Sequence, residues 1–231
     1  MHHIAGDGWS SGVLTRELAA LYDAAMEDQA LSGATLYASA GLVPLEVQYV
    51  DFAHWQREWL SVVSEGQLAY WRGQLGVAGP APLEVPTDRP RPKLQTFNAG
   101  NVQVWLDEGT VAEVATLQRK TGSTLFMVLL GTFQLLLSRY SRQDEVCVGS
   151  PYAGRDHAAT RDIVGYFVNT LAILVDTSGD LTVTEVVARV RTAVLGAFEH
   201  ADVSFAALVD CLKVRRDASR SAVFQAMFAV D

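Results

Sequence analysis

Cysteine is scarce in this chain, which has two cysteines among 231 residues. Two cysteines are too few for the disulfide framework of a small secreted domain. Cys147 falls in an apolar, strand-like segment and Cys211 in an apolar, helix-like one. We interpret both as buried small hydrophobic residues, which is the usual state of a free cysteine. A reduced, cytoplasmic protein is the expectation.

Positive charge is also in deficit. The chain has 18 Lys and Arg against 26 Asp and Glu, a formal net charge of −8. This balance argues against nucleic acid as the main partner, because phosphate binding needs clustered cations. The most basic cluster is 213–216 (Lys-Val-Arg-Arg). We interpret it as the C-terminal end of a helix, where cations complement the helix dipole.

Long apolar runs are missing. The most apolar one, 125–137, is interrupted by Gly131, Thr132 and Gln134. It is too short to span a bilayer, and the first residues lack the pattern of a signal peptide. We therefore expect no membrane partner.

Histidine is scarce as well, with five in the chain. His2, His3 and Asp7 lie close together in the sequence and could be metal ligands, whereas the other histidines, His54, His157 and His200, are isolated. A zinc site needs three or four ligands at suitable spacing, so we predict no bound metal.

What remains is the composition of an ordinary core-forming protein, with 49% hydrophobic and 19% charged residues. Apolar periodicity and capping signals predict helices, with a loop at 29–44. The helices expected are 10–27, 47–63, 65–75, 110–120, 123–140, 182–200 and 204–212. Alternating or continuous apolar runs predict strands at 101–106, 146–149, 168–176 and 222–230. Interleaved helices and strands indicate a layered α/β or α+β fold.

The first residues carry the clearest chemistry. His2 and His3 are followed by Asp7 and Gly8, directly before a predicted helix. Histidine titrates near neutrality, an acid can orient its ring, and glycine permits a tight turn. Free N–H groups at the start of the helix point towards the same place. A purification tag is the alternative for the histidine pair.

This pattern resembles the HHxxxDG signature of condensation domains of nonribosomal peptide synthetases. Four further segments follow in the order of that family. Segment 49–56 resembles YxDFAxWQ, 164–170 resembles IGxFVNT, 200–209 resembles HQDxPFExLV, and 216–225 resembles RDxSRNPLFQ. A proline-rich turn at 86–92 is also common in the family. Segment 200–209 departs from its pattern at Ala201, Ser204 and Ala206, so we interpret it as a packing element.

The resemblance implies a two-lobed, chloramphenicol acetyltransferase-like fold. We expect residues 1–46 to be the C-terminal remnant of the N-terminal lobe, with the histidine loop, and 47–231 to be the C-terminal lobe. The histidines at the very start and a strand at the very end suggest a fragment that is incomplete at both ends and inactive alone.

The resemblance further implies amide formation between two thioesters. A donor acyl group and an acceptor aminoacyl group would arrive on the phosphopantetheine arms of upstream and downstream peptidyl carrier domains. An adenylation domain is the other expected partner, and no cofactor would bind this chain itself. A thioester is already activated, so no enzyme nucleophile is needed, and the sequence has no GxSxG-type context.

The roles expected at the site follow from that reaction. His3 would orient the acceptor amine, with His2 and Asp7 in support, and the Gly8 region would offer an N–H to the developing oxyanion. Trp9 would pack the loop. Arg155 would either bind Asp7 bidentately and hold two lobes in register, or lie exposed. Asn169 would either join the lobes or face the substrate channel.

Two other functions stay open. Epimerization domains also carry HHxxxDG but usually continue DGVSW, whereas this chain continues through Trp9 and Ser10. Docking or recruitment domains of the same fold commonly lose the second histidine or the aspartate, and both His3 and Asp7 are present. The donor and acceptor amino acids, and the choice between L-donor and D-donor subclasses, also stay open.

Overall fold

The computed structural model describes residues 1–214 and 217–230. Arg215 and Arg216, half of the basic cluster at 213–216, lie outside the described residues. Contacts group the chain into two compact units. Unit 1 comprises Met1–Val63 and Ala153–Asn169, and unit 2 comprises Ser64–Tyr152 and Thr170–Asp231. The lobe boundary expected after residue 46 concerns the whole fold and stays a prediction.

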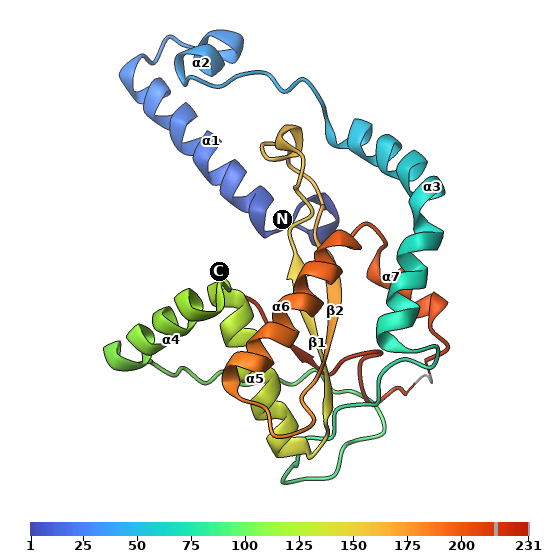
Figure 1. Ribbon diagram of the computed structural model, residues 1–231. Coiled ribbons are helices and arrows are strands. Elements are labelled where there is room, and N and C mark those ends of the chain that lie inside the picture. The colour runs from blue at the N-terminus through green and yellow to red at the C-terminus, as the bar shows by residue number, and fades with distance from the viewer. Residues whose placement is uncertain (215–216, 231) are drawn as a thin grey trace. The chain divides into compact units, whose positions relative to one another are not determined.

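Unit 1 carries the start of the chain and two short 3-10 turns, η1 (His3–Ala5) and η2 (Ala158–Thr160). Helix α1 (Gly8–Glu27) begins at Asp7, whose carboxylate accepts the Ser10 N–H and so caps the helix. Helix α2 (Gly33–Ser39) packs on α1 (Figure 1).

Unit 2 is built around a three-stranded sheet of order β2-β1-β3. Its strands are β1 (Glu145–Tyr152), β2 (Asn169–Asp176) and β3 (Ala226–Met227). β3 runs parallel to β1, with Val148 opposite Ala226. Its helices are the second part of α3 (Tyr49–Leu75), which begins in unit 1, and α4 (Glu108–Thr121), α5 (Leu125–Ser141), α6 (Val183–Glu199) and α7 (Phe205–Cys211).

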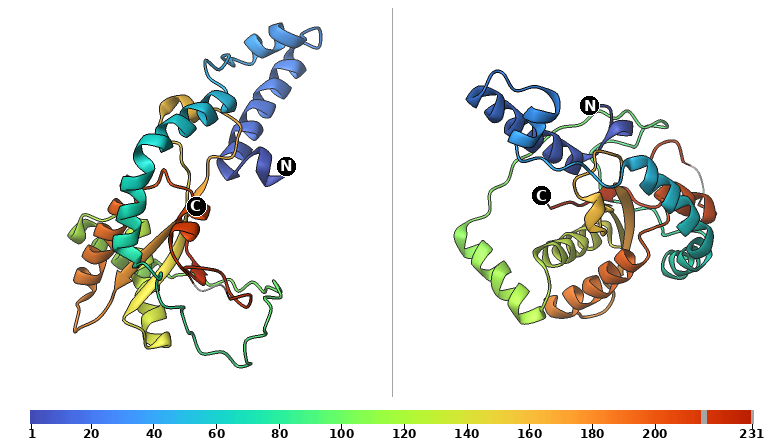
Figure 2. Two further views of the ribbon diagram at one scale, coloured as in Figure 1. Left: turned by 90° about the vertical axis from the view of Figure 1, so that its right-hand side faces the viewer. Right: turned by 90° about the horizontal axis from the view of Figure 1, so that it is seen from above.

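Apolar faces of α5 and α6 form the core of unit 2 with the sheet. Leu130 of α5, Val148 of β1 and Val190 of α6 are completely buried. Helix α4 contacts α5 and α6 but contributes no buried residue (Figure 2). The polar side chain of Gln134 is completely buried in this core, and its Nε2 donates to the carbonyl oxygens of Val146 and Ile173, at 3.1 and 2.9 Å. A single amide thus joins α5 to both β1 and β2.

Several sequence predictions are confirmed. Helices at 10–27, 123–140, 182–200 and 204–212 correspond to α1, α5, α6 and α7. The capping box that opens α6 is present, with Thr182 and Glu185 bonding each other's backbone N–H groups. The strands expected at 146–149 and 168–176 correspond to β1 and β2.

Other predictions were wrong. A single helix, α3 (Tyr49–Leu75), replaces the two expected at 47–63 and 65–75, because no proline interrupts it and Ser64, at the expected break, is tolerated inside a helix. The predicted loop at 29–44 contains α2. The helix expected at 110–120 is present as α4, but the capping box expected at Thr110 and Glu113 does not open it: α4 starts at Glu108, and the Asp107 carboxylate caps it by accepting the Thr110 N–H.

The other two strand predictions were also wrong. Residues 101–106 pair with no strand among the described residues, and their Val102 and Trp105 side chains are exposed. An alternating pattern gives a strand two faces, but the strand forms only beside a partner. The strand expected at 222–230 is reduced to Ala226–Met227.

Among the described residues, no single helix is long and apolar enough to cross a membrane. Helices α4 and α5 together reach that length and composition, but the pair is bent by 106° at its break.

Candidate active site

The ring of His3 is oriented by the backbone of its own loop. Its Nδ1 lies 3.0 Å from the carbonyl oxygen of Gly6. A carbonyl oxygen only accepts, so Nδ1 is the nitrogen that carries the proton. In the neutral ring the lone pair is therefore on Nε2. The side chain is exposed, so Nε2 can accept a hydrogen bond from a molecule outside the loop.

His2 has the opposite arrangement. The Ile4 N–H donates to its Nδ1 at 3.1 Å, which places the proton of the neutral ring on Nε2. His2 thereby caps the η1 turn that carries His3. The structure therefore supports a local structural role for His2.

Tyr166 lies against the ring of His3. The two rings meet edge to face, with centroids 5.4 Å apart and planes at 81°. The Tyr49 hydroxyl donates to the Tyr166 carbonyl oxygen at 2.8 Å, which ties this segment to α3. The Tyr166 side chain is 45% exposed, so it borders the same open side as His3. Sequence analysis did not identify it, because position 166 is the variable one in the IGxFVNT pattern.

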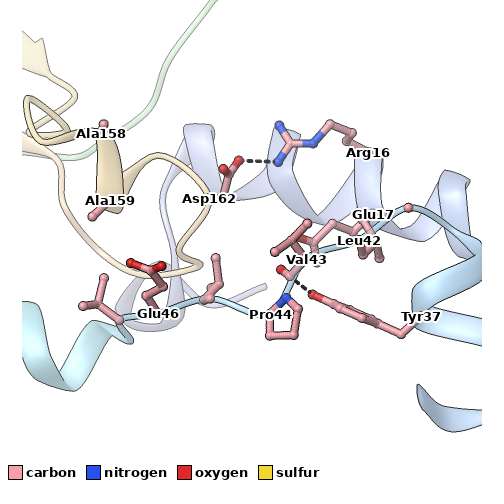
Figure 3. Close-up of a pocket in the computed structure, with 13 residues that line it drawn as sticks. Arg16, Glu17, Tyr37, Leu42, Val43, Pro44, Glu46, Ala158, Ala159 and Asp162 are labelled. Carbon is pink, nitrogen blue, oxygen red and sulfur yellow. Dashed lines mark hydrogen bonds and ion pairs between the residues drawn. The ribbon is translucent and has the colours of Figure 1, made fainter. Parts of the chain in front are cut away.

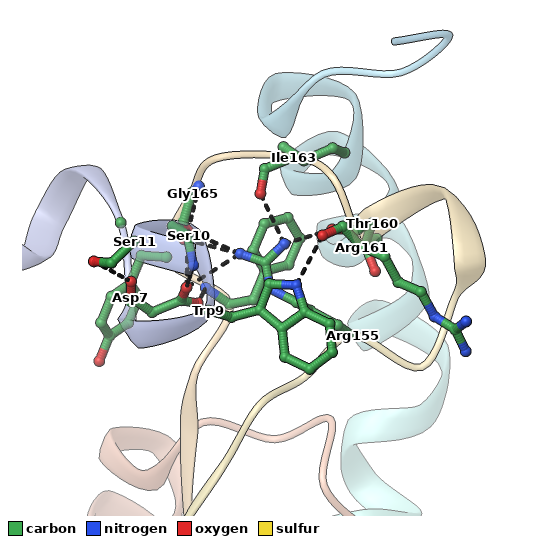
Figure 4. Close-up of polar contacts among 12 residues, drawn as sticks. Asp7, Trp9, Ser10, Ser11, Arg155, Thr160, Arg161, Ile163 and Gly165 are labelled. Atoms are coloured by element: carbon green, nitrogen blue, oxygen red, sulfur yellow. Dashed lines mark hydrogen bonds and ion pairs between the residues drawn. The ribbon is translucent and has the colours of Figure 1, made fainter. Parts of the chain in front are cut away.

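Asp7 is buried and points away from that open side, into a polar cluster (Figure 4). Its Oδ1 accepts from the Ser10 N–H at 2.9 Å and from Arg155 Nη2 at 3.1 Å. Its Oδ2 accepts from the Phe167 N–H at 3.0 Å. Asp7 therefore fixes the loop to the 155–167 segment, and it does not touch the histidine rings.

The pKa of Asp7 is below the ordinary value for an aspartate. Burial alone would raise it, because a low dielectric disfavours the charged form. The backbone N–H groups of Ser10 and Phe167, the Ser10 hydroxyl and the charge of Arg155 act in the opposite direction and prevail. Asp7 is accordingly an anion that holds structure rather than a group poised to exchange protons.

Arg155 is buried, as the first alternative for this residue requires, and it contacts Asp7. The contact is a single Nη2–Oδ1 interaction, so the expected bidentate geometry is wrong. The other nitrogen, Nη1, donates to the carbonyl oxygens of Thr160 and Ile163 instead. The guanidinium carbon lies 4.1 Å from the centre of the Phe167 ring. Arg155 thus binds the backbone of its own loop through Nη1 and the start of α1 through Nη2, all inside unit 1.

Ser10 is the residue of this cluster that sequence reasoning missed. Its hydroxyl oxygen accepts from Arg155 Nη2 at 2.9 Å and from the Gly165 N–H at 3.1 Å. It lies 2.8 Å from two acceptors for its one proton, Asp7 Oδ1 and the Gly165 carbonyl oxygen. One signal was available, since Ser10 stands three residues before buried Val13 and so shares the inward face of α1.

The remaining predicted residues lie at the edges of this arrangement. Gly8 is the first residue of α1 and is exposed. Trp9 donates from its indole N–H to the Arg161 carbonyl oxygen at 2.8 Å, and it lines a pocket of about 510 Å³ with Arg16 and Asp162. Asn169 opens β2 and is half-buried.

A second pocket, of about 490 Å³, lies between α1, the 41–47 segment and η2 (Figure 3). An Arg16–Asp162 ion pair of 2.6 Å borders it, and the Tyr37 hydroxyl donates to the Val43 carbonyl oxygen. None of the predicted site residues lines this pocket.

Histidines outside the loop have structural surroundings. His54 is exposed beside Glu58, and the ring of His157 meets that of Trp55. His200 stacks on Tyr70 at 3.8 Å, and its carbonyl oxygen accepts the Trp71 indole N–H. These contacts agree with our interpretation of 200–209 as a packing element. Within residues 1–214 and 217–230, no three His, Cys, Asp or Glu side chains gather as a metal site would require.

Comparison with known proteins accounts for the whole chain. The family model of the Condensation domain matches residues 1–231. A linear gramicidin synthase of Brevibacillus parabrevis is 45% identical over 231 residues, but the chain spans only 4% of its length.

Solved structures give the fold. The X-domain from teicoplanin biosynthesis, in complex with OxyB, has a TM-score of 0.82 and 29% identity, over 98% of this chain and 49% of that one. A four-domain nonribosomal peptide synthetase, AB3403, has a TM-score of 0.79 at 23% identity, over 96% of this chain and 16% of that one. The fold is therefore the chloramphenicol acetyltransferase-like fold that the motifs implied. The chain belongs to the condensation-domain family of nonribosomal peptide synthetases.

Proposed function

We propose that this chain supplies the histidine loop of an amide-forming condensation domain. The observation that carries the proposal is the orientation of His3. Its Nδ1 is committed to the Gly6 carbonyl oxygen, so a lone pair on Nε2 is presented on an exposed side chain. That lone pair is suited to accept an N–H of an incoming amine.

The proposed reaction joins two carrier-bound substrates. The α-amine of the acceptor attacks the carbonyl carbon of the donor thioester, a C–N bond forms and the C–S bond breaks. The amine gives up one proton, and the upstream carrier leaves as a thiol. Free α-amines titrate near 7.7–8.0, so little base strength is required and positioning dominates. His3 acts chiefly by holding the amine and secondarily by taking its proton.

The other residues support that step. The cluster of Asp7, Arg155 and Ser10 anchors the histidine loop to the 155–167 segment, and His2 caps the η1 turn. Gly8 stands at the positive end of the α1 dipole, where a backbone N–H suits a developing oxyanion. Asn169 and Trp9 are proposed to border the substrate path.

The family context supports the proposed partners. Upstream and downstream peptidyl carrier domains would deliver the substrates on their own phosphopantetheine, and an adenylation domain would select the acceptor. The chain itself would bind no cofactor. We propose that the reaction takes place in the cytoplasm and needs neither nucleic acid nor a membrane.

A recruitment role is the second candidate, and one comparison favours it. A structural relative that covers 98% of the chain is an X-domain in complex with OxyB. A recruitment domain would not need His3, so the two functions can be separated.

The test uses the intact synthetase with its donor and acceptor thioesters loaded. Replacement His3→Ala is expected to slow single-turnover amide formation by about 10²–10⁴-fold. His54→Ala, which removes an exposed histidine of α3, should leave the rate unchanged. Loading of both carriers is measured separately as a control for folding.

Other outcomes assign other functions. Unchanged amide formation by His3→Ala would remove His3 from the mechanism and favour recruitment. Incorporation of deuterium from heavy water at the α-carbon of the carrier-bound residue would indicate epimerization. The 231-residue chain alone is expected to form no amide, and turnover by it would contradict the expectation that further chain is needed.

A further inference from the structure

We propose that Ser10 is a positioning residue, which sets the contact between His3 and Tyr166 by holding the backbone of Gly165. This inference rests on the proposed role of His3. It adds a residue that touches neither ring but joins the two segments that carry them.

The first step concerns how His3 is held. Its ring has two described contacts, the Gly6 carbonyl oxygen and the edge-to-face contact with Tyr166. Gly6 belongs to the same loop and moves with it. Tyr166 belongs to a segment more than 150 residues away in the sequence, so its placement must be set independently.

The second step concerns the residue just before Tyr166. Ser10 Oγ accepts the Gly165 N–H at 3.1 Å and lies 2.8 Å from the Gly165 carbonyl oxygen. A Cβ on Gly165 would lie only 2.1 Å from Cδ2 of Tyr49, so the Tyr49 ring packs directly on this backbone. Gly165 is therefore fixed by a hydroxyl and by an aromatic ring, and the direction in which Tyr166 leaves it is fixed as well.

The third step concerns the contacts of Ser10 with Asp7, in the histidine loop. The same hydroxyl oxygen contacts Asp7 Oδ1, and the Ser10 N–H donates to that atom. Asp7 follows Gly6 directly, so Ser10 connects the acceptor of His3 Nδ1 with the residue that precedes Tyr166. Its side chain is fully buried, and its contacts cannot be replaced by water without opening the cluster.

Removing the Ser10 hydroxyl should therefore loosen the 163–167 segment. In Ser10→Ala the Gly165 N–H and Arg155 Nη2 lose an acceptor, while the Asp7 contacts to Arg155 and Phe167 remain. A displacement on the order of 1 Å near reacting groups can cost about a hundredfold in rate. We expect amide formation to slow about tenfold to a hundredfold.

The first measurement does not depend on activity. Hydrogen–deuterium exchange of the intact synthetase, read by mass spectrometry, should show faster exchange at 163–167 in Ser10→Ala and unchanged exchange in α5 and α6. Ser11→Ala is the matched control, since Ser11 is the next residue on α1, is exposed, and makes only a 3.4 Å contact to the Asp7 carbonyl oxygen. Unchanged exchange at 163–167, or an increase throughout the domain, would overturn the proposal.

The second measurement is a double-mutant cycle on single-turnover amide formation. If Ser10 acts by placing Tyr166, Ser10→Ala should slow the Tyr166→Ala variant little further. If the two residues act independently, the fold-changes in rate of the two single variants should multiply in the double variant. Fully multiplicative effects would overturn the proposal. Should Ser10→Ala not fold, Ser10→Cys keeps a weak donor and acceptor and should give a smaller change at 163–167.

The two proposals fail separately. A normal rate of amide formation in His3→Ala would contradict the proposed function. Hydrogen–deuterium exchange at 163–167 would still decide whether Ser10 holds Gly165.

Discussion

Asp7 Oδ1 and Arg155 Nη2 lie 3.1 Å apart although 148 positions separate the two residues in the sequence. Their side chains are 4% and 1% exposed, so the pair is shielded from water. Each charge is further satisfied by hydrogen bonds, the carboxylate by two backbone N–H groups and the guanidinium by two carbonyl oxygens. The histidine loop is thus anchored by a buried ion pair that never reaches the histidines.

Breaking this pair should destabilise the protein strongly. Asp7→Ala leaves the Arg155 cation buried without its anion, and losses of this kind are about 3–5 kcal/mol. Urea denaturation followed by tryptophan fluorescence measures the change. Asp162→Ala is the matched control, because it removes an exposed pair with Arg16 and should cost at most about 1 kcal/mol. Equal effects of the two substitutions would contradict the anchoring role.

The same anchor predicts a pH dependence. The folded-state pKa of Asp7 is lowered, so its contribution to stability is present above the unfolded value of about 3.9 and is lost as pH falls through the folded pKa. Wild type should therefore exceed Asp7→Asn in free energy of unfolding at pH 7, and the difference should shrink below about pH 4. A difference that stays constant down to pH 3 would show that Asp7 is not held as an anion.

Gly165 should tolerate no side chain. An added Cβ meets the Tyr49 ring at 2.1 Å, so Gly165→Ala forces that ring to move, and such overpacking costs about 1–3 kcal/mol. Gly12→Ala is the opposite case, since Gly12 lies within α1 with nothing near its missing Cβ. It should stabilise the protein by about 0.5–1 kcal/mol. Thermal denaturation of both variants checks whether Gly165→Ala lowers and Gly12→Ala raises the stability.

The two cysteines should differ in reactivity. Burial raises the pKa of Cys147 to about 12, so almost no thiolate is present at pH 8. Cys211 is only partly buried. Iodoacetamide should therefore label Cys211 in the native protein and both cysteines in denaturant, as peptide mass spectrometry can show. Rapid native labelling of Cys147 would mean that β1 opens to solvent.

The sequence patterns correctly predicted the elements that are determined by contacts between residues close together in the chain. The box of Thr182 and Glu185 and the apolar face behind it are enough to define α6, because both partners of each contact lie within one helix. The pattern at 101–106 was misread because a strand depends on a neighbour that the pattern does not name. The split of α3 at Ser64 was wrong because one serine weakens a helix without ending it.

At the site, the motif indicated the histidine loop but not what holds it. Ser10, Tyr166 and Phe167 act through contacts to residues about 100 or more positions away, and no periodicity encodes such partners. Arg155 was identified as a partner for Asp7, but its carbonyl acceptors were not foreseen. Their geometry could be read only from the folded chain.

The hydrogen bond between His3 Nδ1 and the Gly6 carbonyl oxygen limits the route of a proton in the proposed reaction. A ring whose second nitrogen faces the backbone cannot relay a proton from one side to the other. A proton that Nε2 takes from the amine must also leave from Nε2, so uptake and release occur at the same ring nitrogen. The departing sulfur, or a solvent molecule beside it, must come to that same edge of the imidazole before the next cycle begins.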